Sequence, residues 1–183
     1  MNPNIQVIDN FVSGEALAEL TQFFTHQCDW RWCDSCVYPL NDEECKERFA
    51  NKDYDYQNTL TCNPFDDYQL VHIIYAQYQY LSPIRLYPFF QQLGANAVVR
   101  CKANLNPRTK EIVKHSYHTD VPFDCKTAVF YLNTCDGYTE FEECGTRVES
   151  VAGRIVIFPS QLRHTGTSTT NDKKRIVINT NYF

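Results

Sequence analysis

The sequence lacks the features that mark membrane-spanning and nucleic-acid-binding chains. Its longest apolar-looking stretch, VHIIYAQYQYL, is short and interrupted by glutamines, so we expect no segment to span a bilayer. Positive charge is also scarce, because 17 Lys and Arg residues face 22 Asp and Glu residues and leave a net charge of −5. Since nucleic-acid binders usually carry a basic field, we expect neither a nucleic-acid partner nor a membrane partner.

A secretory start, internal repeats and low-complexity tracts are missing as well. MNPNIQVIDN has no basic region followed by an apolar run, so we expect a cytoplasmic protein whose thiols stay reduced. The chain has 183 residues, of which 43% are hydrophobic. That length favours a single domain over 1–183, with a core large enough to need no disulfide or metal staples.

Helical periodicity is confined to the first half of the chain. Ser13 can cap a helix whose apolar side chains share one face: Leu17, Leu20, Phe23 and Phe24. The same pattern predicts a second helix over 66–81, and an early proline with a late glycine predicts a short third helix over 87–94. We therefore expect 1–95 to be mainly helical and to provide support and the rim of a pocket.

From residue 97 onward the sequence changes to short β-branched and aromatic segments separated by turn residues. The expected strands are AVVRCKANL (97–105), TAVFYLN (127–133), TRVESV (146–151), GRIVIFP (153–159) and RIVINTNYF (175–183). Short strands at this spacing indicate a sandwich, a barrel or a jelly roll. The predicted fold class is therefore α+β and mainly β, with helices packed outside one β core at 97–183.

Two histidines and an aspartate fall within HSYHTD (115–120), in a chain with only five histidines. In extended backbone, residues two apart point the same way, so His118 and Asp120 can aim at one point. His164 follows the expected strand GRIVIFP and can supply a third ligand. Two histidines and one carboxylate leave coordination positions open, as in non-haem Fe(II) oxygenases. An isolated H-x-D is weak evidence, because such pairs are more often surface hydrogen bonds.

Arg175 begins the last expected strand, where it shares one face with Val177 and Asn179. An arginine inside a β core needs an anion to offset its desolvation, and its planar fork can hold a carboxylate. A dicarboxylate bound to the metal at its other end would supply that anion. The alternative is a surface arginine that follows two lysines. The order of the three ligands and the strands favours the first interpretation.

Taken together, these segments resemble the 2-oxoglutarate/Fe(II)-dependent oxygenases, and most closely their prolyl 4-hydroxylase-like branch. The resemblance covers about 97–183 and rests on four segments: HTDVPFDCKTAVFYLN, GYTEFE, VAGRIVIFPSQLRHTGT and KRIVINTNYF. It implies a double-stranded β-helix, which is a jelly roll. It also implies Fe(II) as the metal, 2-oxoglutarate as co-substrate, O₂ as oxidant and ascorbate as an optional support.

The same resemblance assigns metal binding and catalysis to three residues: His118, Asp120 and His164. It implies that Arg175 binds the far carboxylate of 2-oxoglutarate and that Tyr131 contacts the same carboxylate. Asn104 corresponds, by a looser alignment, to a polar co-substrate contact. The implied reaction is hydroxylation of an unactivated C–H bond, with a protein side chain such as proline as the favoured substrate. Two alternatives stay open: a hydroxylase that acts on a small molecule, and a metal-binding module without turnover.

Nine cysteines are a high number for a chain of this length, and four lie close together: Cys28, Cys33, Cys36 and Cys45. They could bind zinc, but their spacing matches no standard pattern, so we favour buried reduced thiols. His115 precedes His118 by three residues. In a strand that offset points to the opposite face, so we expect a polar residue near the mouth of the site, not a fourth ligand.

Overall fold

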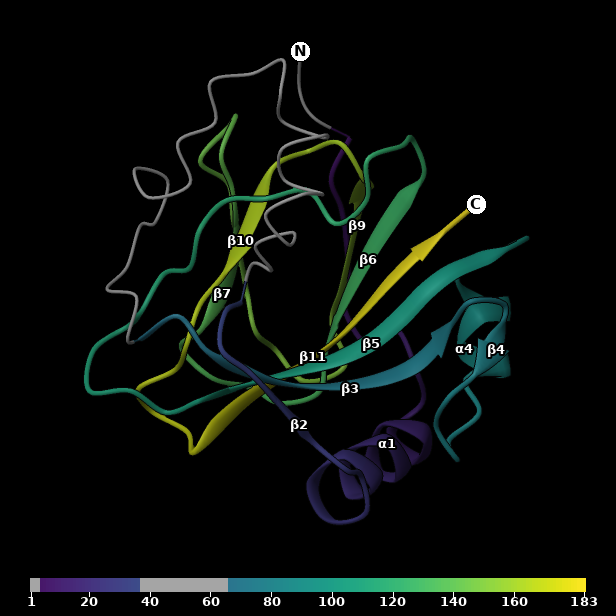
Figure 1. Cartoon of the computed structure of the whole chain (residues 1–183), viewed down its shortest axis with the longest axis horizontal. Helices are drawn as coiled ribbons and strands as arrows, with labels where there is room; N and C mark the ends of the chain where they lie inside the picture. Colours follow the sequence, from purple (N-terminus) through teal and green to yellow (C-terminus); the bar gives the residue numbers. More distant parts are fainter. Residues whose placement is uncertain (1–3, 37–65) are drawn as a thin grey trace.

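Two antiparallel β-sheets form the core of the protein in the computed structural model, which describes residues 4–36 and 66–183 (Figure 1). Among these residues the larger sheet has the order β1-β9-β6-β11-β5-β3-β2, with β4 paired to β3. Its strands are β1 (Gln6–Ile8), β2 (Arg31–Cys33), β3 (Gln69–Ala76), β4 (Gln79–Tyr80), β5 (Val98–Pro107), β6 (Lys126–Tyr131), β9 (Ile155–Pro159) and β11 (Lys174–Tyr182). The smaller sheet has the order β10-β7-β8: β7 (Tyr138–Phe141), β8 (Arg147–Glu149) and β10 (His164–Gly166).

This arrangement is a jelly roll, and it confirms the predicted mainly β fold class. All the strands predicted after residue 97 are present, as β5, β6, β8, β9 and β11. The periodicity did not reveal β7 and β10. With four and three residues they are too short to show a clear alternation, yet they supply much of the second sheet.

Alternation along β11 separates two environments. Ile176 and Ile178 belong to the larger apolar cluster, which is packed against the helices outside the sheet. Val177 belongs to the smaller cluster between the two sheets, together with Phe141 of β7 and Val148 of β8. Arg175 and Asn179 have the same parity as Val177, so β11 presents polar groups to the space between the sheets.

Helix α1 (Gly14–His26) and helix α4 (Tyr87–Gln92) pack on the outer face of the larger sheet, as predicted. Ser13 caps α1 by accepting a hydrogen bond from the Ala16 N–H at 3.2 Å. Phe89 of α4 meets Phe130 of β6 edge to face, with ring centroids 5.4 Å apart. No helix among the described residues is long and apolar enough to cross a membrane.

The helix predicted over 66–81 is wrong. That range contains β3 and β4, joined at Gln77 and Tyr78, which have φ angles of 51° and 62°. The segment is rich in β-branched and aromatic residues taken together, and β3 pairs with β5 on one side and β2 on the other. These long-range hydrogen bonds outweigh a helical period that depends on only a few apolar positions. The described part of 1–95 is therefore not mainly helical, since it contributes β1 to β4 besides α1 and α4.

The strand assignment for β3 can be tested with two adjacent isoleucines. Ile74 is fully buried, whereas Ile73 is 37% exposed on the opposite face. We expect Ile74→Ala to lower the free energy of unfolding by about 2–5 kcal/mol, because it leaves a cavity in the core. Ile73→Ala should cost about 0.5–1 kcal/mol. Urea unfolding of both variants measures the difference, and equal losses would contradict this alternation.

Candidate metal and anion site

His118 and His164 are fixed opposite each other by their own backbones. Each donates its backbone N–H to the carbonyl of the other, with N···O distances of 2.9 and 3.0 Å. The centroids of the two rings lie 4.8 Å apart. Asp120 follows two residues after His118, as the H-x-D spacing predicts. The ligand atoms of the three side chains all lie within 4.8 Å of one another, so residues 44 positions apart in sequence converge.

Both imidazoles present the same nitrogen to the cluster. The Nδ1 atom of His118 lies 3.1 Å from the Ser116 carbonyl oxygen, and that of His164 lies 3.2 Å from the Leu162 carbonyl oxygen. These acceptors assign the proton to Nδ1, which leaves the Nε2 lone pair for a metal. Burial, followed by the neighbouring His164, lowers the pKa of His118 to about 4. At neutral pH His118 is therefore uncharged, as a ligand must be.

The carboxylate of Asp120 is only 3% exposed and is held from two sides. Oδ1 accepts a hydrogen bond from Arg100 Nη2 at 3.1 Å, and Oδ2 accepts one from Asn179 Nδ2 at 2.9 Å. Burial acts to raise the pKa of Asp120, but the interactions with its neighbours, chiefly His164 and Arg100, outweigh burial, and the pKa lies below its usual value. The group is thus an ionised, oriented oxygen ligand beside two imidazole nitrogens, a donor set that suits Fe(II).

Arg175 is a buried cation between the two sheets, with 2% of its surface exposed. Nε donates to Ser150 Oγ at 2.7 Å, Nη2 to Thr139 Oγ1 at 3.1 Å and Nη1 to the Thr167 carbonyl at 3.5 Å. No carboxylate in the described part of the chain forms an ion pair with it. Burial lowers the pKa of Arg175, although an arginine still stays charged at neutral pH. An uncompensated charge of this kind favours an anionic ligand.

Two glycines make room for this guanidinium. A Cβ atom at Gly137 would lie 2.5 Å from Arg175 Cδ and 2.6 Å from the Ser168 carbonyl oxygen. At Gly166 it would lie 3.2 Å from Arg175 Nη1. The arginine therefore occupies a space that larger residues would fill.

The two remaining residues named from the sequence lie on the same inner face. The centre of the Arg175 guanidinium lies 5.5 Å from the centroid of the Tyr131 ring, and the Tyr131 hydroxyl donates to Thr139 Oγ1 at 2.9 Å. Asn104 lies on β5 opposite Val177 of β11. Its Oδ1 atom is buried and has no hydrogen-bond partner among the described residues, so it can accept from a molecule in this space.

Sequence reasoning missed several residues of the site. Arg100 and Lys102 could have been found by alternation from Asn104, since all three share one face of β5. Burial, together with Arg100, lowers the pKa of Lys102 to about 8, and this amine lies near the candidate metal ligands. Thr139 and Ser150 carry no comparable signal, because the short strands around them show no clear period.

The structure separates His115 from the other two histidines. Its side chain is 4% exposed, and its Nδ1 lies 3.1 Å from Asp67 Oδ1, so it is buried instead of lying at the mouth of the site. Of the four clustered cysteines, Cys33 is buried and Cys28 and Cys36 are half-buried. Cys45 lies outside the described residues.

Comparison with solved structures identifies the fold. The chain is similar to a prolyl-4-hydroxylase from Pseudomonas putida, with 16% identity over 99% of this chain and 93% of that one and a TM-score of 0.57. An oxidoreductase of the 2OG-Fe(II) oxygenase family from Burkholderia pseudomallei gives 11% identity, coverage of 97% and 84%, and a TM-score of 0.62.

A third similar structure is the non-haem alpha-ketoglutarate-dependent epimerase SnoN from nogalamycin biosynthesis, with 13% identity, coverage of 99% and 78%, and a TM-score of 0.61. No protein-family model and no curated protein sequence matches the chain. The fold is therefore that of 2-oxoglutarate/Fe(II) oxygenase structures, at identities too low to transfer a reaction.

The close approach at Gly137 gives a stability prediction. We expect Gly137→Ala to lower the free energy of unfolding by about 1–3 kcal/mol, because the new methyl group overlaps Arg175 and backbone. Gly14→Ala is the matched control, since nothing lies within 4 Å of a Cβ at that position on α1. The control should raise stability by about 0.5–1 kcal/mol. Thermal unfolding compares the two variants, and a neutral Gly137→Ala would refute the tight packing around the guanidinium.

Proposed function

We propose that the protein is an Fe(II)- and 2-oxoglutarate-dependent dioxygenase that hydroxylates an unactivated C–H bond. The observation that carries this proposal is the buried, uncompensated Arg175 guanidinium beside a cluster of two histidines and one carboxylate. A structural metal site does not need an anion-binding group, and a buried arginine on its own does not need a metal. A ligand that is both a metal chelator and a carboxylate accounts for the two features together.

Strand β10 links the two halves of the candidate site. His164 begins this strand, and the Thr167 carbonyl that accepts from Arg175 follows three residues later. Three residues of extended chain span only about 10 Å, so a single small ligand that carries both a chelating group and a carboxylate suits both halves.

Each residue of the site has a role under this proposal. His118, Asp120 and His164 hold the metal, and the Arg100 and Asn179 contacts keep the carboxylate from rotating. Arg175 binds the far carboxylate of 2-oxoglutarate, with Tyr131 and Thr139 beside it, and Asn104 contributes a polar contact in the same space. Fe(II) bound there would supply the redox chemistry by which O₂ and 2-oxoglutarate oxidise a C–H bond.

For the substrate we favour a protein side chain such as proline, in line with the similarity to the Pseudomonas putida prolyl-4-hydroxylase. The alternative is a small molecule, which the comparable similarity to the epimerase SnoN supports. A screen of peptides and metabolites for stimulated 2-oxoglutarate consumption, with mass detection of an added oxygen, decides between the two classes. A metal-binding module without turnover is the remaining alternative, and it predicts no consumption at all.

The metal ligands give the first activity prediction. With Fe(II), O₂, 2-oxoglutarate and ascorbate, we expect the protein to form succinate slowly even without its substrate. His118→Ala and Asp120→Ala should abolish this turnover, because each removes a metal ligand. His26→Ala, which alters an exposed histidine of α1, is the control and should leave the rate unchanged. Full activity in either ligand variant would disprove the assignment. Absence of both turnover and 2-oxoglutarate binding in the unmodified protein would favour the binding-module alternative.

The anion site gives the second activity prediction. Arg175→Leu should raise the 2-oxoglutarate concentration required for half-maximal turnover by roughly a hundredfold, or about 2–3 kcal/mol, because a charge-assisted bidentate contact is lost. Fe(II) affinity should change little. Arg85→Leu removes an exposed arginine near α4 and serves as the control. An unchanged co-substrate requirement in Arg175→Leu would rule out this role for the guanidinium.

A further inference from the structure

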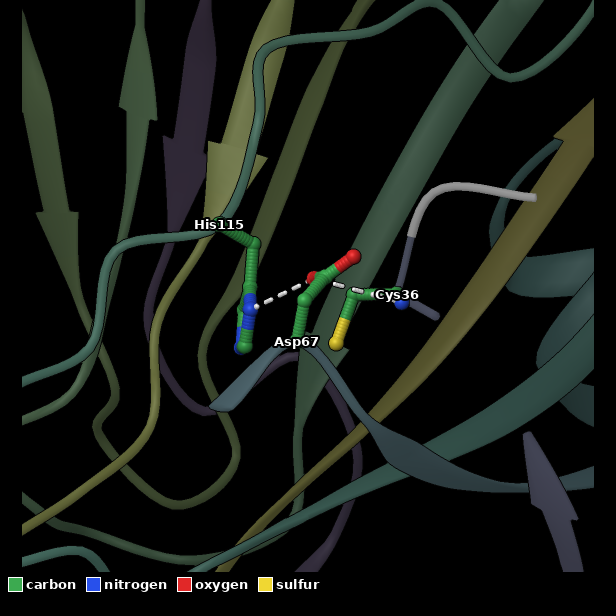
Figure 2. Close-up of side chains that lie close together, drawn as sticks. All are labelled: Cys36, Asp67 and His115. Carbon is green, nitrogen blue, oxygen red and sulfur yellow. Dashed lines mark hydrogen bonds and ion pairs between the residues drawn. The ribbon is translucent and has the colours of Figure 1, made fainter. Parts of the chain in front are cut away.

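A second group of metal-ligating side chains lies apart from the first. Figure 2 shows Cys36, Asp67 and His115 converging from three segments of the chain. Their candidate ligand atoms all lie within 4.8 Å of one another, the same limit that describes the His118 cluster. Asp67 and His115 are 3% and 4% exposed, so the group is not a surface collection of charges.

Strand pairing explains why two of these residues meet. β2 and β3 are antiparallel, with Cys33 opposite Gln69, and the chain beyond this pair brings residues 35 and 36 beside residue 67. Asp67 Oδ2 accepts a hydrogen bond from the Ser35 hydroxyl at 2.6 Å, and Oδ1 accepts one from the Cys36 N–H at 3.4 Å. The carboxylate is therefore held at a fixed position close to the Cys36 side chain.

His115 is fixed by the strand that also carries His164. Its backbone N–H donates to the Gly166 carbonyl at 3.2 Å, and its own carbonyl accepts from the Thr165 hydroxyl at 2.7 Å. These contacts direct the ring to Asp67, where Nδ1 lies 3.1 Å from Oδ1. His115 is therefore not part of the group formed by His118, Asp120 and His164, in accord with the three-residue offset between the two histidines.

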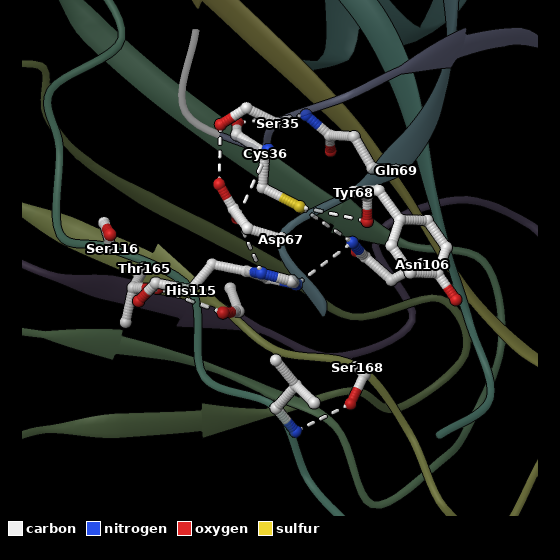
Figure 3. Close-up of polar contacts among 12 residues, drawn as sticks. Ser35, Cys36, Asp67, Tyr68, Gln69, Asn106, His115, Ser116, Thr165 and Ser168 are labelled. Carbon is white, nitrogen blue, oxygen red and sulfur yellow. Dashed lines mark hydrogen bonds and ion pairs between the residues drawn. The ribbon is translucent and has the colours of Figure 1, made fainter. Parts of the chain in front are cut away.

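The side-chain amide of Asn106 contacts both the thiol and the imidazole (Figure 3). Its Nδ2 atom is 3.6 Å from Cys36 Sγ and 3.4 Å from His115 Nε2. Outer contacts of this kind orient metal ligands and stabilise a thiolate. Because the amide can turn over, it can serve either tautomer of the ring.

We propose that Cys36, Asp67 and His115 form a second divalent-metal site, and that Zn²⁺ is the ion it fits best. Sulfur, nitrogen and carboxylate oxygen together are a typical ligand set for zinc. A thiolate, a carboxylate and a neutral imidazole balance the two positive charges of the ion, so no net charge is buried. Metal–ligand bonds of about 2.0–2.3 Å put ligand atoms about 3.3–3.8 Å apart. The ligand atoms now lie up to 4.8 Å apart. Side-chain shifts of about 1 Å would therefore bring them to the distances that a bound ion requires.

Cobalt distinguishes this site from the first one, because only the second contains a thiolate. The test uses the full chain carrying both His118→Ala and Asp120→Ala, titrated with Co²⁺. We expect one equivalent to produce the near-ultraviolet charge-transfer band of a cobalt–thiolate bond, and added Zn²⁺ to abolish it. A Co²⁺ ion bound by nitrogen and oxygen alone does not give this band. The result is independent of turnover, so it stands apart from the test of the proposed oxygenase.

Three further substitutions locate the bound ion. In the same background, Cys36→Ser should abolish the band and His115→Gln should weaken Co²⁺ binding by at least about tenfold. Cys144→Ser, which changes an exposed cysteine between β7 and β8, is the matched control and should keep the band. A band that persists in Cys36→Ser, or no band in the parent protein, would overturn the proposal.

A stability measurement tests the same site without the Cys36→Ser variant, so the test holds even if that variant does not fold. Zn²⁺ should raise the melting temperature of the His118→Ala, Asp120→Ala protein, because the ion binds the folded state. The same addition should not raise it once His115→Gln is introduced. An equal rise in both proteins would place the ion elsewhere and refute the assignment.

Discussion

Two reciprocal backbone hydrogen bonds between His118 and His164 are the constraint on which the candidate site depends. They bring together a segment that follows β5 and the first residue of β10, and they require no side-chain chemistry to do so. Once the backbones are paired, carbonyls two residues upstream of each histidine accept from Nδ1 and turn Nε2 toward Asp120. The backbone contacts thus determine both the position and the tautomer of the two histidines before any ion binds.

The larger sheet supports this geometry by dividing its residues between two faces. Its outer face carries the aromatic and aliphatic side chains that pack under α1 and α4. Its inner face carries Arg100, Asn104, Arg175 and Asn179, whose burial is costly unless each finds a partner. Some of these partners are internal, such as the Asp120 carboxylate. For Arg175 they are only neutral oxygens, and this imbalance is the physical basis for expecting a bound anion.

Much of this arrangement could be predicted from the sequence, and the failures have physical causes. Arg175 was named as a candidate because it lies in a long strand with a clear alternation, and His164 because it follows the expected strand 153–159. The H-x-D motif was recognised from its spacing alone. The segment 66–81 was assigned to a helix because its period was ambiguous, and only pairing with β5 and β2 resolves it. The Asp67–His115 contact could not be foreseen, since no local pattern links residues 48 positions apart. His115 was correctly excluded from the first cluster but could not be given a partner.

The alternation of β11 places core residues on one face of the strand and residues of the candidate site on the other. The fold and the site therefore depend on the same strand register. A shift of this strand by one residue against β5 and β6 would exchange its two faces. The guanidinium would then enter the aromatic layer beneath the helices, and Ile176 and Ile178 would face the polar space. A chain with this register shift would lose both its apolar core packing and the arrangement of the candidate site. Misregistered molecules are therefore unstable, so a stably folded population presents Arg175 to the space between the sheets.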